Sequence, residues 1–262
     1  MKKLLLIALT LLSCAGSQKT GTLSFVTLDE EAARGREIAV QSPKLLRLVR
    51  NHEISDFFNQ LGKELGAKSD WTGLEYTVFI VNEPDLNHFS LPGGSIYIYR
   101  GLVEKAETAH EVAAVLSHEI AHIGRRNAVN RMANKYSYAF AAQSVFGQNP
   151  ELAIQILQNL FTEDTILDYP EKEEYSADAL AAKYMWKANY DPEGLLTLVQ
   201  KIRLQDKENK DSVALLRRTH PPFLNRINRI RRELTSMPHH DGLRRDLAEF
   251  SRIRDQLMRI PR

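Results

Sequence analysis

Hydrophobic residues recur every three or four positions through most of the chain, a spacing typical of amphipathic helices. Two short runs, at residues 76–81 and 95–99, are instead rich in β-branched and aromatic residues and predict strands. We predict a loop at residues 82–89, between these strands. The predicted helices, bounded by glycine and proline breaks, lie at residues 28–38, 54–65, 108–124, 129–146, 151–161, 171–188, 192–203 and 221–234. The expected fold is therefore α+β and mostly helical, with a small β-sheet.

The strand at residues 95–99 is open to two interpretations. It alternates strictly between residue types after the Pro-Gly-Gly turn at 92–94, and it stands just before the helix at 108–124. It could be an exposed edge strand bordering that helix, on which an extended peptide pairs through main-chain hydrogen bonds. Equally, it could be an ordinary hairpin strand with Tyr97 and Tyr99 on its solvent-facing side. The sequence alone does not choose between them.

The N-terminus has the pattern of a lipoprotein signal peptide. Lys2 and Lys3 precede an apolar run at residues 4–12 that is too short to span a bilayer, and Cys14 follows. The chain holds 1 cysteine, so a lone buried thiol is the alternative, and neither an intrachain disulfide nor a cysteine-ligated metal is expected. The expected division is a signal peptide at residues 1–13, a lipidated N-terminus and tether at 14–27, and one domain at 28–262.

The charge balance excludes one class of partner. The sequence holds 35 Lys and Arg against 33 Asp and Glu, and loss of Lys2 and Lys3 with the signal peptide would leave 33 of each sign. A chain without net charge has no overall electrostatic attraction for nucleic acid, so none is expected as a partner. From Arg217 onward, 12 arginines face five acids. This C-terminal segment, which ends in a short basic helical stretch at 237–262, could therefore contact anionic lipid or lipopolysaccharide, although solvated helical faces are the simpler interpretation.

The strongest chemical signal is the stretch His118-Glu119-Ile120-Ala121-His122, which reads HExxH within the helix predicted at 108–124. Positions four apart on a helix project about 40° apart and one turn along the axis, so the imidazoles of His118 and His122 can converge on one tetrahedral ion such as zinc. Glu119 projects about 100° away from His118, where it can take a proton from a zinc-activated water. A chance match on a buried helix is the alternative.

A catalytic zinc with two histidine ligands commonly takes a carboxylate as its third ligand. Glu171, Glu173 and Glu174 all lie at the start of the helix predicted at 171–188. Glu174 is favoured, because Asp178 lies one turn farther on the same face and could accept a hydrogen bond from a ligand histidine. The alternative is that this acidic run is a solvated first turn.

Two groups farther along the chain could complete the site. His220 and Arg226 open the last long helix, where they could be a capping group and a surface charge. They could also reach the zinc pocket and stabilise the oxyanion of a tetrahedral intermediate. We predict His110 on the helix surface and His239 with His240 in a loop. These three histidines are not expected to be ligands, because the HExxH helix already supplies the needed set.

Together these motifs resemble peptidase family M48, the zinc metallopeptidases that include CAAX prenyl proteases and bacterial periplasmic lipoprotein peptidases. The resemblance rests on His118-Glu119-x-x-His122, on Glu174-x-x-x-Asp178, and on His220-Pro221 with Arg226. Also in agreement are Asn87-His88-Phe89, the Leu-Pro-Gly-Gly run at 91–94, Gly101-Leu102, and Glu31 followed by Gly35. The resemblance extends from about residue 28 to residue 234.

The resemblance implies a gluzincin, or zincin-like, metallopeptidase domain at residues 28–262. It places one Zn²⁺ on His118, His122 and Glu174. It also assigns Glu119 as the general base, Asp178 as the support of a ligand histidine, and His220 with Arg226 as transition-state or gating groups. In some relatives the loop histidine plugs the metal, so His220 could be a fourth ligand at rest.

The sequence departs from the family pattern at three positions. Ser176 stands where Glu is usual, Asn127 where His is frequent, and His88 where a small residue is common. None of these changes removes a ligand or the base. We therefore expect activity and leave substrate preference open.

The leading hypothesis is a zinc endopeptidase of the bacterial envelope that acts on extended or misfolded envelope proteins. By resemblance to lipoprotein sorting patterns, Cys14 followed by Ala15 predicts a periplasmic protein, lipid-anchored at the outer membrane of a diderm bacterium. Outer-membrane assembly proteins are then candidate partners. The second hypothesis is a membrane-anchored chaperone or adaptor that holds clients on the strand at 95–99 and keeps a plugged zinc. Glu119 counts against it, because a pure binder needs no base.

Overall fold

The computed structural model describes residues 27–136, 154, 157–159, 167–238 and 241–262. The longer helices in this part of the chain are α1 (Leu28–Gln41), α2 (His52–Gly66), α4 (Ala109–Gly124), α5 (Asn127–Tyr136), α8 (Glu171–Lys187), α9 (Glu193–Glu208), α11 (Phe223–Ser236) and α12 (Phe250–Arg259). Two short helices are α3 (Arg100–Lys105) and α10 (Ala214–Thr219), and the strands are β1 (Thr77–Val81), β2 (His88–Leu91) and β3 (Ser95–Tyr99). The expected α+β, mostly helical fold with a small sheet is confirmed.

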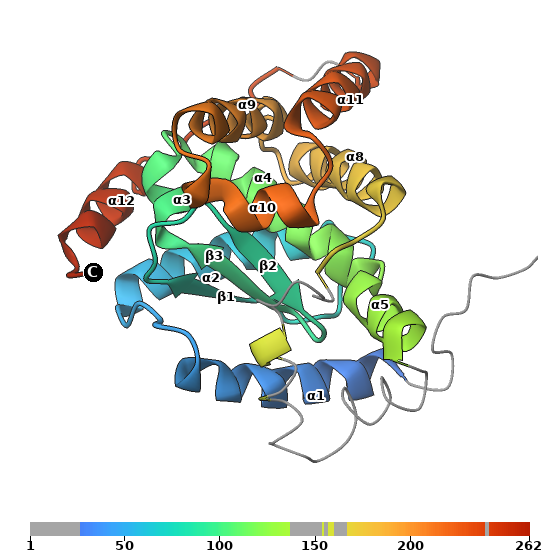
Figure 1. Cartoon of the computed structure of the whole chain (residues 1–262). Coiled ribbons are helices and arrows are strands. Elements are labelled where there is room, and N and C mark those ends of the chain that lie inside the picture. The colour runs from blue at the N-terminus through green and yellow to red at the C-terminus, as the bar shows by residue number, and fades with distance from the viewer. Residues whose placement is uncertain (1–26, 137–153, 155–156, 160–166, 239–240) are drawn as a thin grey trace, which may run out of the picture.

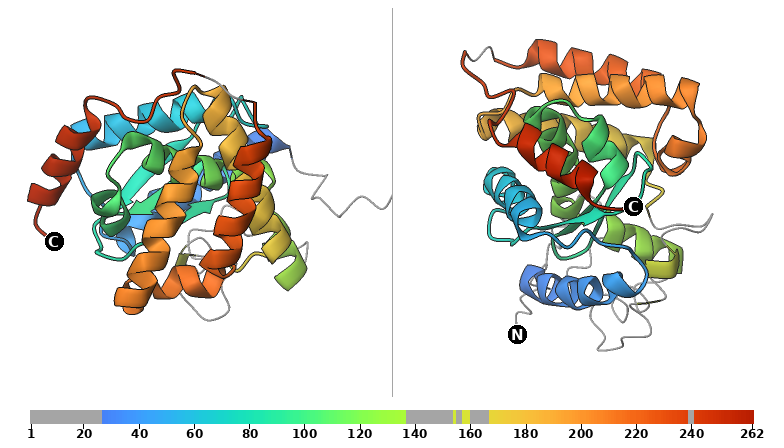
Figure 2. Two further views of the ribbon diagram at one scale, coloured as in Figure 1. Left: turned by 90° about the horizontal axis from the view of Figure 1, so that it is seen from above. Right: turned by 90° about the vertical axis from the view of Figure 1, so that its left-hand side faces the viewer.

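The elements form layers that run from α1 at one side to α9 and α11 at the other (Figures 1 and 2). The sheet lies next to α1, and α2 and α4 cover its opposite face (Figure 1). Helix α4 packs against α2, α8, α9 and β2, and all its residues from Ala109 to Ile123 are buried. Burial on every side explains why the hydrophobic positions of this helix are not confined to one stripe.

β3 is the central strand of the sheet, whose order is β1-β3-β2. β1 runs parallel to β3, β2 runs antiparallel to it, and every residue of β3 is buried. Both interpretations of residues 95–99 are therefore wrong, because this strand is neither an exposed edge nor half exposed to solvent. The reason is that both faces of the sheet are covered. Tyr97 stacks between Phe79 and Phe89, with ring centroids 5.0 and 4.7 Å away, in a cluster that includes Ile38 of α1.

β2 is an edge strand of the sheet that the structure describes, and it packs against α4. The expected edge strand beside the HExxH helix is thus present, but it is formed by another stretch. The loop predicted at residues 82–89 is wrong at its end, because antiparallel pairing of His88 with Ile98 draws this end into the sheet. All four residues of β2 are buried, so no alternation marks the strand in the sequence.

Helix α1 packs closely on the turn between β2 and β3. A Cβ at Gly35 would lie 1.9 Å from the carbonyl oxygen of Pro92, so only glycine permits this approach. Gly93 in the turn has a φ of +84°, a conformation that glycine adopts without strain. Glu31, one turn before Gly35, accepts a hydrogen bond of 2.6 Å from Nε of Arg126, just beyond α4. α1 therefore braces both the turn and the end of the HExxH helix.

Several predictions fall on residues outside the described part of the chain. They are the signal peptide at 1–13, most of the tether with Cys14, and most of the helices predicted at 129–146 and 151–161. The division into a tether and one domain at 28–262 stays a prediction. None of the helices that the structure describes is long and apolar enough to cross a lipid bilayer.

Candidate metal centre

Four elements bring the candidate site residues together. The HExxH helix α4 carries His118, Glu119 and His122, and α8 carries Glu174 and Asp178. The loop from α10 to α11 supplies His220, and α11 supplies Arg226. Apart from His220, which is 7% exposed at its side chain, each of these side chains is at most 4% exposed. The predicted set of residues therefore forms one buried cluster.

The distances within this cluster fit a single tetrahedral ion. The Nε2 atoms of His118 and His122 lie 3.0 Å apart. The two carboxylate oxygens of Glu174 lie 3.3 Å from Nε2 of His122 and 3.6 Å from Nε2 of His118. Ligands bound at about 2.0 Å around a tetrahedral zinc ion are separated by about 3.3 Å. Three side chains thus present their donor atoms at the spacing that zinc requires.

Glu174 gives an independent indication that a cation belongs here. The residue is fully buried, and neither of its carboxylate oxygens accepts a conventional hydrogen bond from the residues that the structure describes. A buried carboxylate that accepts no hydrogen bond is strongly destabilising unless a positive charge compensates it. A divalent cation held between Glu174 and the two histidines would supply that charge.

His220 also reaches this cluster. Its Nε2 lies 3.4 Å from Glu174, and ligand atoms of His118, Glu174 and His220 all lie within 4.8 Å of one another. Burial, with the positive charge of Arg226, holds the pKa of His220 well below its usual range. The imidazole is therefore neutral at physiological pH, which is the form that binds a metal. His220 is placed so that it can be a fourth ligand.

Asp178 connects His118 to Arg226 behind the metal ligands. Nδ1 of His118 donates a hydrogen bond of 3.0 Å to Oδ1 of Asp178. Arg226 donates to both oxygens of Asp178, over 3.0 and 2.7 Å. Burial would raise the pKa of Asp178, but Arg226 and His118 outweigh it and hold that pKa well below its usual range. Arg226 therefore pairs with an ionised Asp178 and reaches the ligand His118 only through that carboxylate.

Glu119 pairs with His88 of β2. Nδ1 of His88 donates a hydrogen bond of 2.5 Å to Oε1 of Glu119, and both side chains are 4% exposed. The ring of His88 also meets the rings of His118 and His220 edge-on, with centroids 5.7 and 5.3 Å apart. Burial would raise the pKa of Glu119, but His88 and the charges of the other histidines outweigh it and lower the pKa to about 2. Glu119 is thus held in its ionised form beside the ligands.

The other histidines lie away from this arrangement or outside the described residues. The prediction that His110 lies on the helix surface is wrong, because it is 7% exposed. Its Nδ1 is 2.7 Å from the hydroxyl of Thr108, and Gly194 of α9 packs directly on it. The close packing of α9 on α4 accounts for its burial. His239 and His240 fall outside the residues that the structure describes.

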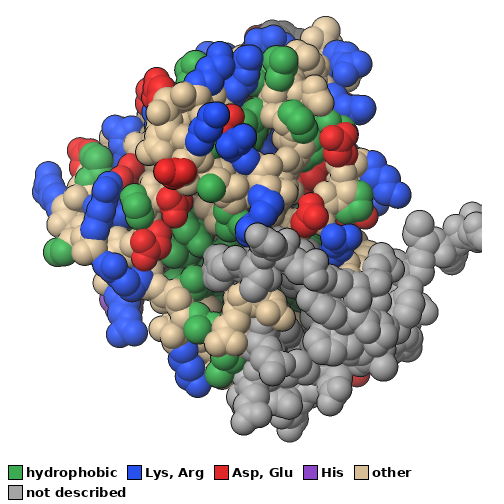
Figure 3. Space-filling model, in the orientation of Figure 1, with side chains coloured by type: hydrophobic (Ala, Val, Ile, Leu, Met, Phe, Trp, Pro, Cys, Tyr) green, Lys and Arg blue, Asp and Glu red, His purple; other side chains and the backbone are tan. Residues whose placement is uncertain are grey.

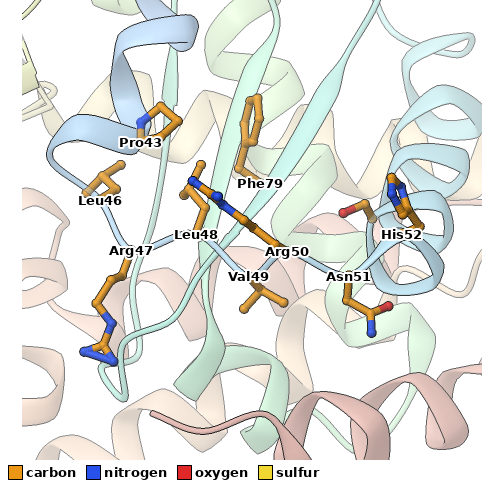
Figure 4. Close-up of a pocket in the computed structure, with 10 residues that line it drawn as sticks. Pro43, Leu46, Arg47, Leu48, Val49, Arg50, Asn51, His52 and Phe79 are labelled. Atoms are coloured by element: carbon orange, nitrogen blue, oxygen red, sulfur yellow. The ribbon is translucent and has the colours of Figure 1, made fainter.

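A cavity of about 670 Å³ lies apart from the metal centre (Figure 4). It is lined by the segment between α1 and α2, by the start of α2, and by Phe79 of β1. Arg47 and Arg50 stand on this segment (Figure 4). None of the metal-centre residues lines it, so it has no part in the candidate site.

The comparison with known families decides between a chance HExxH and a true metallopeptidase centre. Residues 49–234 match the model of peptidase family M48, and this range holds every residue of the cluster described above. The chain belongs to peptidase family M48. The resemblance seen in the sequence is thereby confirmed.

Proteases from bacteria, yeast and a plant are similar in sequence to this chain. The β-barrel assembly-enhancing protease of Yersinia pestis is 25% identical over 246 residues, which are 90% of this chain and 50% of the relative. The mitochondrial metalloendopeptidase OMA1 of Schizosaccharomyces pombe is 26% identical over 183 residues, 68% of this chain and 52% of the relative. OMA1 of Arabidopsis thaliana is 30% identical over 161 residues, 61% and 32% of the two chains. The chain thus spans about half the length of the first two relatives.

Membership in M48 makes the chain a zinc metallopeptidase by family, which agrees with the ligand spacing and with the unpartnered carboxylate of Glu174. The prediction of zinc as cofactor is confirmed. The family match and the geometry together exclude the interpretation of residues 171–174 as no more than a solvated first turn, since Glu174 is fully buried.

Three residues beside the M48 centre were not predicted as site residues: His88, Asn127 and Tyr169. The amide nitrogen Nδ2 of Asn127 lies 2.9 Å from Nδ1 of His122. A 180° rotation of the carboxamide would present its oxygen to the proton that Nδ1 carries when Nε2 binds zinc. Tyr169 stacks on the ring of His122 at 4.4 Å. In the sequence, Asn127 and His88 stand out only as departures from the family pattern, and Tyr169 does not stand out. Asn127 stands five residues after His122, where the family pattern often has His, so that departure is a signal that could have identified it. Tyr169 has no fixed spacing from HExxH.

Proposed function

We propose that this chain is a zinc-dependent endopeptidase of the bacterial cell envelope that hydrolyses extended or misfolded envelope proteins. The observation that carries the proposal is the buried pairing of a complete ligand set with an ionised Glu119 beside it. A site that only held a structural zinc would have no use for a buried base next to the ligands.

Each residue has a proposed part in the reaction. His118, His122 and Glu174 hold zinc, which when bound lowers the pKa of water and polarises the scissile carbonyl. Because Oε1 of Glu119 accepts from His88, Oε2 takes the proton of the attacking water and later returns it to the leaving amine. Asp178 fixes His118 with Nδ1 protonated and Nε2 turned inward.

His220 and Arg226 are proposed to act from the opposite side of the ligands. Arg226 keeps Asp178 ionised and in place, so it supports the site through that carboxylate. His220 lies near enough to Glu174 either to complete a resting metal site or to donate to the oxyanion of the tetrahedral intermediate. A gain of activity in His220→Ala would identify the resting ligand, and a loss would identify the donor.

Substitution of the base tests the proposed mechanism. Glu119→Gln should retain one zinc ion but lose at least about 100-fold in peptide cleavage, since the amide cannot accept the proton. Zinc content by atomic absorption and hydrolysis of a fluorogenic peptide measure the two properties. Glu171→Gln, an exposed change at the start of α8, is the matched control and should behave as wild type. Cleavage by Glu119→Gln at the wild-type rate would remove Glu119 from the mechanism.

The proposed location is the periplasmic face of the outer membrane, with a lipid anchor on Cys14. It is supported by the signal-peptide pattern and by similarity to β-barrel assembly-enhancing proteases, whose name concerns barrel assembly. Outer-membrane assembly proteins are the proposed partners. Fractionation of cells carrying Cys14→Ser tests the anchor, because the protein should move from the membrane to the soluble fraction. Unchanged membrane association would refute lipid anchoring at Cys14. Import of the protein into mitochondria would instead favour a location like that of the mitochondrial OMA1 relatives.

The chaperone or adaptor hypothesis loses its main support. It placed clients on the strand at residues 95–99, and this strand is the buried centre of the sheet. If Glu119→Gln supported full function in cells, a binding role would nevertheless have to replace the enzymatic one.

A further inference from the structure

His88 is the residue through which the edge strand β2 reaches the catalytic machinery. It is 6% exposed and stands at the first position of β2, where it pairs with Ile98 of β3. From there its Nδ1 reaches Oε1 of Glu119 on α4, and its ring lies against that of His220. One side chain thus contacts the base and the loop histidine, which belong to two other segments.

We propose that His88 is a positioning residue that holds the Glu119 carboxylate so that Oε2, and not Oε1, faces the attacking water. The inference rests on the proposed function, in which Glu119 is the general base. His88 itself need not touch the substrate.

A glutamate side chain on a helix adopts many orientations unless a partner holds its carboxylate. Glu119 has three rotatable side-chain bonds, and its terminal torsion is only weakly restricted by the helix. A proton acceptor works well only when it is held near the productive geometry. Among the residues that the structure describes, the hydrogen bond to Glu119 comes from His88. Without this donor, burial alone does not select one orientation of the carboxylate.

His88 is itself well fixed, which a positioning residue must be. Its backbone lies in the antiparallel ladder between β2 and β3. Its ring is confined by the edge-on rings of His118 and His220, with interplanar angles of 80 and 76°. The carboxylate of Glu119 can accept but not donate, so Nδ1 of His88 carries the proton of the hydrogen bond. The sheet thereby fixes the orientation of a side chain on the neighbouring helix.

The test uses variants that separate the donor from the volume of the side chain. In His88→Asn, Nδ2 stands where Nδ1 of histidine stands, so the donor to Glu119 is retained. In His88→Gln, Nε2 takes the place of Nε2 of histidine, and the donor at Nδ1 is lost. His88→Ala removes both, and His52→Ala, at an exposed histidine of α2, is the control. The full-length proteins are compared for kcat, KM, zinc content and melting temperature.

We expect His88→Ala and His88→Gln to lower kcat by about 10- to 100-fold with KM and zinc content unchanged. His88→Asn should recover kcat to within about 3-fold of wild type, and His52→Ala should match it. The double variant His88→Ala/Glu119→Gln should be no slower than Glu119→Gln alone, because His88 acts through that carboxylate. A KM effect without a kcat effect, or equal losses in His88→Asn and His88→Ala, would overturn the inference.

A second readout does not depend on turnover. Crystal structures of the metal-free proteins should show one conformer of the Glu119 carboxylate in wild type and His88→Asn, and several in His88→Ala. A single unchanged conformer in His88→Ala would contradict a positioning role even if the enzyme were slow. The two proposals fail in different ways. Activity in Glu119→Gln refutes the base itself, whereas an inactive Glu119→Gln with a fully active His88→Ala refutes only the role of His88.

Discussion

Asp178 joins two buried groups that belong to different helices, His118 of α4 and Arg226 of α11. Its carboxylate accepts a hydrogen bond of 3.0 Å from Nδ1 of His118 and two hydrogen bonds from Arg226, one from Nε and one from a terminal guanidinium nitrogen. An ionised carboxylate in this position orients the ligand and neutralises an arginine that is 3% exposed. A single residue therefore links metal affinity to the packing of α4, α8 and α11.

Asp178→Asn should harm both properties. The amide cannot accept from His118 and from both nitrogens of Arg226, and it leaves a buried cation without a counter-charge. We expect zinc affinity to fall about 10- to 100-fold and the free energy of unfolding to fall by about 3 to 5 kcal/mol. Competition with a chromogenic chelator and urea denaturation measure the two effects. Asp168→Asn, at a side chain that is 54% exposed, is the matched control. Unchanged zinc affinity in Asp178→Asn would show that the hydrogen bond to His118 has no bearing on the metal.

At this scale the sequence predicts what lies within one helix. His118, Glu119 and His122 share α4, and Glu174 and Asp178 share α8, so helical spacing is enough to group each set. His88 and Asn127 come from other elements. Their contacts depend on how β2 and α5 pack beside α4, which no residue spacing records.

At the scale of elements, the basic C-terminal segment is fastened to the rest of the chain by its own arginines. The side chains of this segment pair as follows: Arg244 with Glu64, Arg245 with Asp191, Arg252 with Glu53, and Arg262 with Glu104. Arg254 donates to the carbonyl of Ala106. The acids and carbonyl they contact belong to α2, α3 and the connections beside α3 and α9. The excess of arginines at 237–262 therefore has an intramolecular explanation, which favours it over contact with lipid.

Arg100 of α3 also holds the C-terminal segment, by donating hydrogen bonds to its backbone. It is 2% exposed and donates to the carbonyls of Met258 and Ile260 and to the side chain of Asn82. Asn82 in turn donates to the carbonyl of Pro261. The last turn of α12 is thereby held against α3 and the end of β1, where Figures 1 and 2 also show it beside α2.

Arg100→Met should detach the end of α12. The substitution removes the donor to two carbonyl groups at the end of α12 and the ion pair between the buried Arg100 and Glu104. We expect a loss of about 3 kcal/mol in the free energy of unfolding. Limited proteolysis should then cut near residue 260 before the rest of the chain is degraded. Arg259→Met, an exposed change on the same helix, should alter stability by no more than about 0.5 kcal/mol. Equal stabilities for the two variants would show that Arg100 does not hold the segment.

Most of the helices can be predicted from the sequence because they keep the spacing of three to four residues between hydrophobic positions. Strands β2 and β3 are harder to predict, because they are buried on both faces. Ser95–Tyr99 alternates in residue type, but both of its faces are buried, since Tyr97 packs in the aromatic stack beneath α1 while Ile96 and Ile98 join the main core. Tyrosine occurs both on solvent-exposed faces and in hydrophobic cores, so an alternating Ile and Tyr pattern does not show whether one face of the strand is exposed. Alternation alone therefore cannot show which strand of a sheet is central.

At the scale of the whole molecule, the metal centre lies where the sheet edge, the HExxH helix and the helical layer of α8 and α11 meet. Charged side chains of both signs are interspersed over the face seen in Figure 3, without a single basic field. This distribution agrees with the near-balance of charges in the sequence. Substrate choice is therefore expected to depend on the shape and contacts of the site more than on long-range charge.

Degradation of casein by the full-length protein is the most direct test of the central claim that this chain is a zinc endopeptidase. The protein is assayed as purified, after treatment with 1,10-phenanthroline, and after zinc is restored, with Glu119→Gln beside it. We predict cleavage that disappears with the metal, returns with zinc, and is absent from Glu119→Gln. Undiminished cleavage in the metal-free or Glu119→Gln protein would contradict the claim, as would complete inactivity of both the zinc-loaded wild type and His220→Ala.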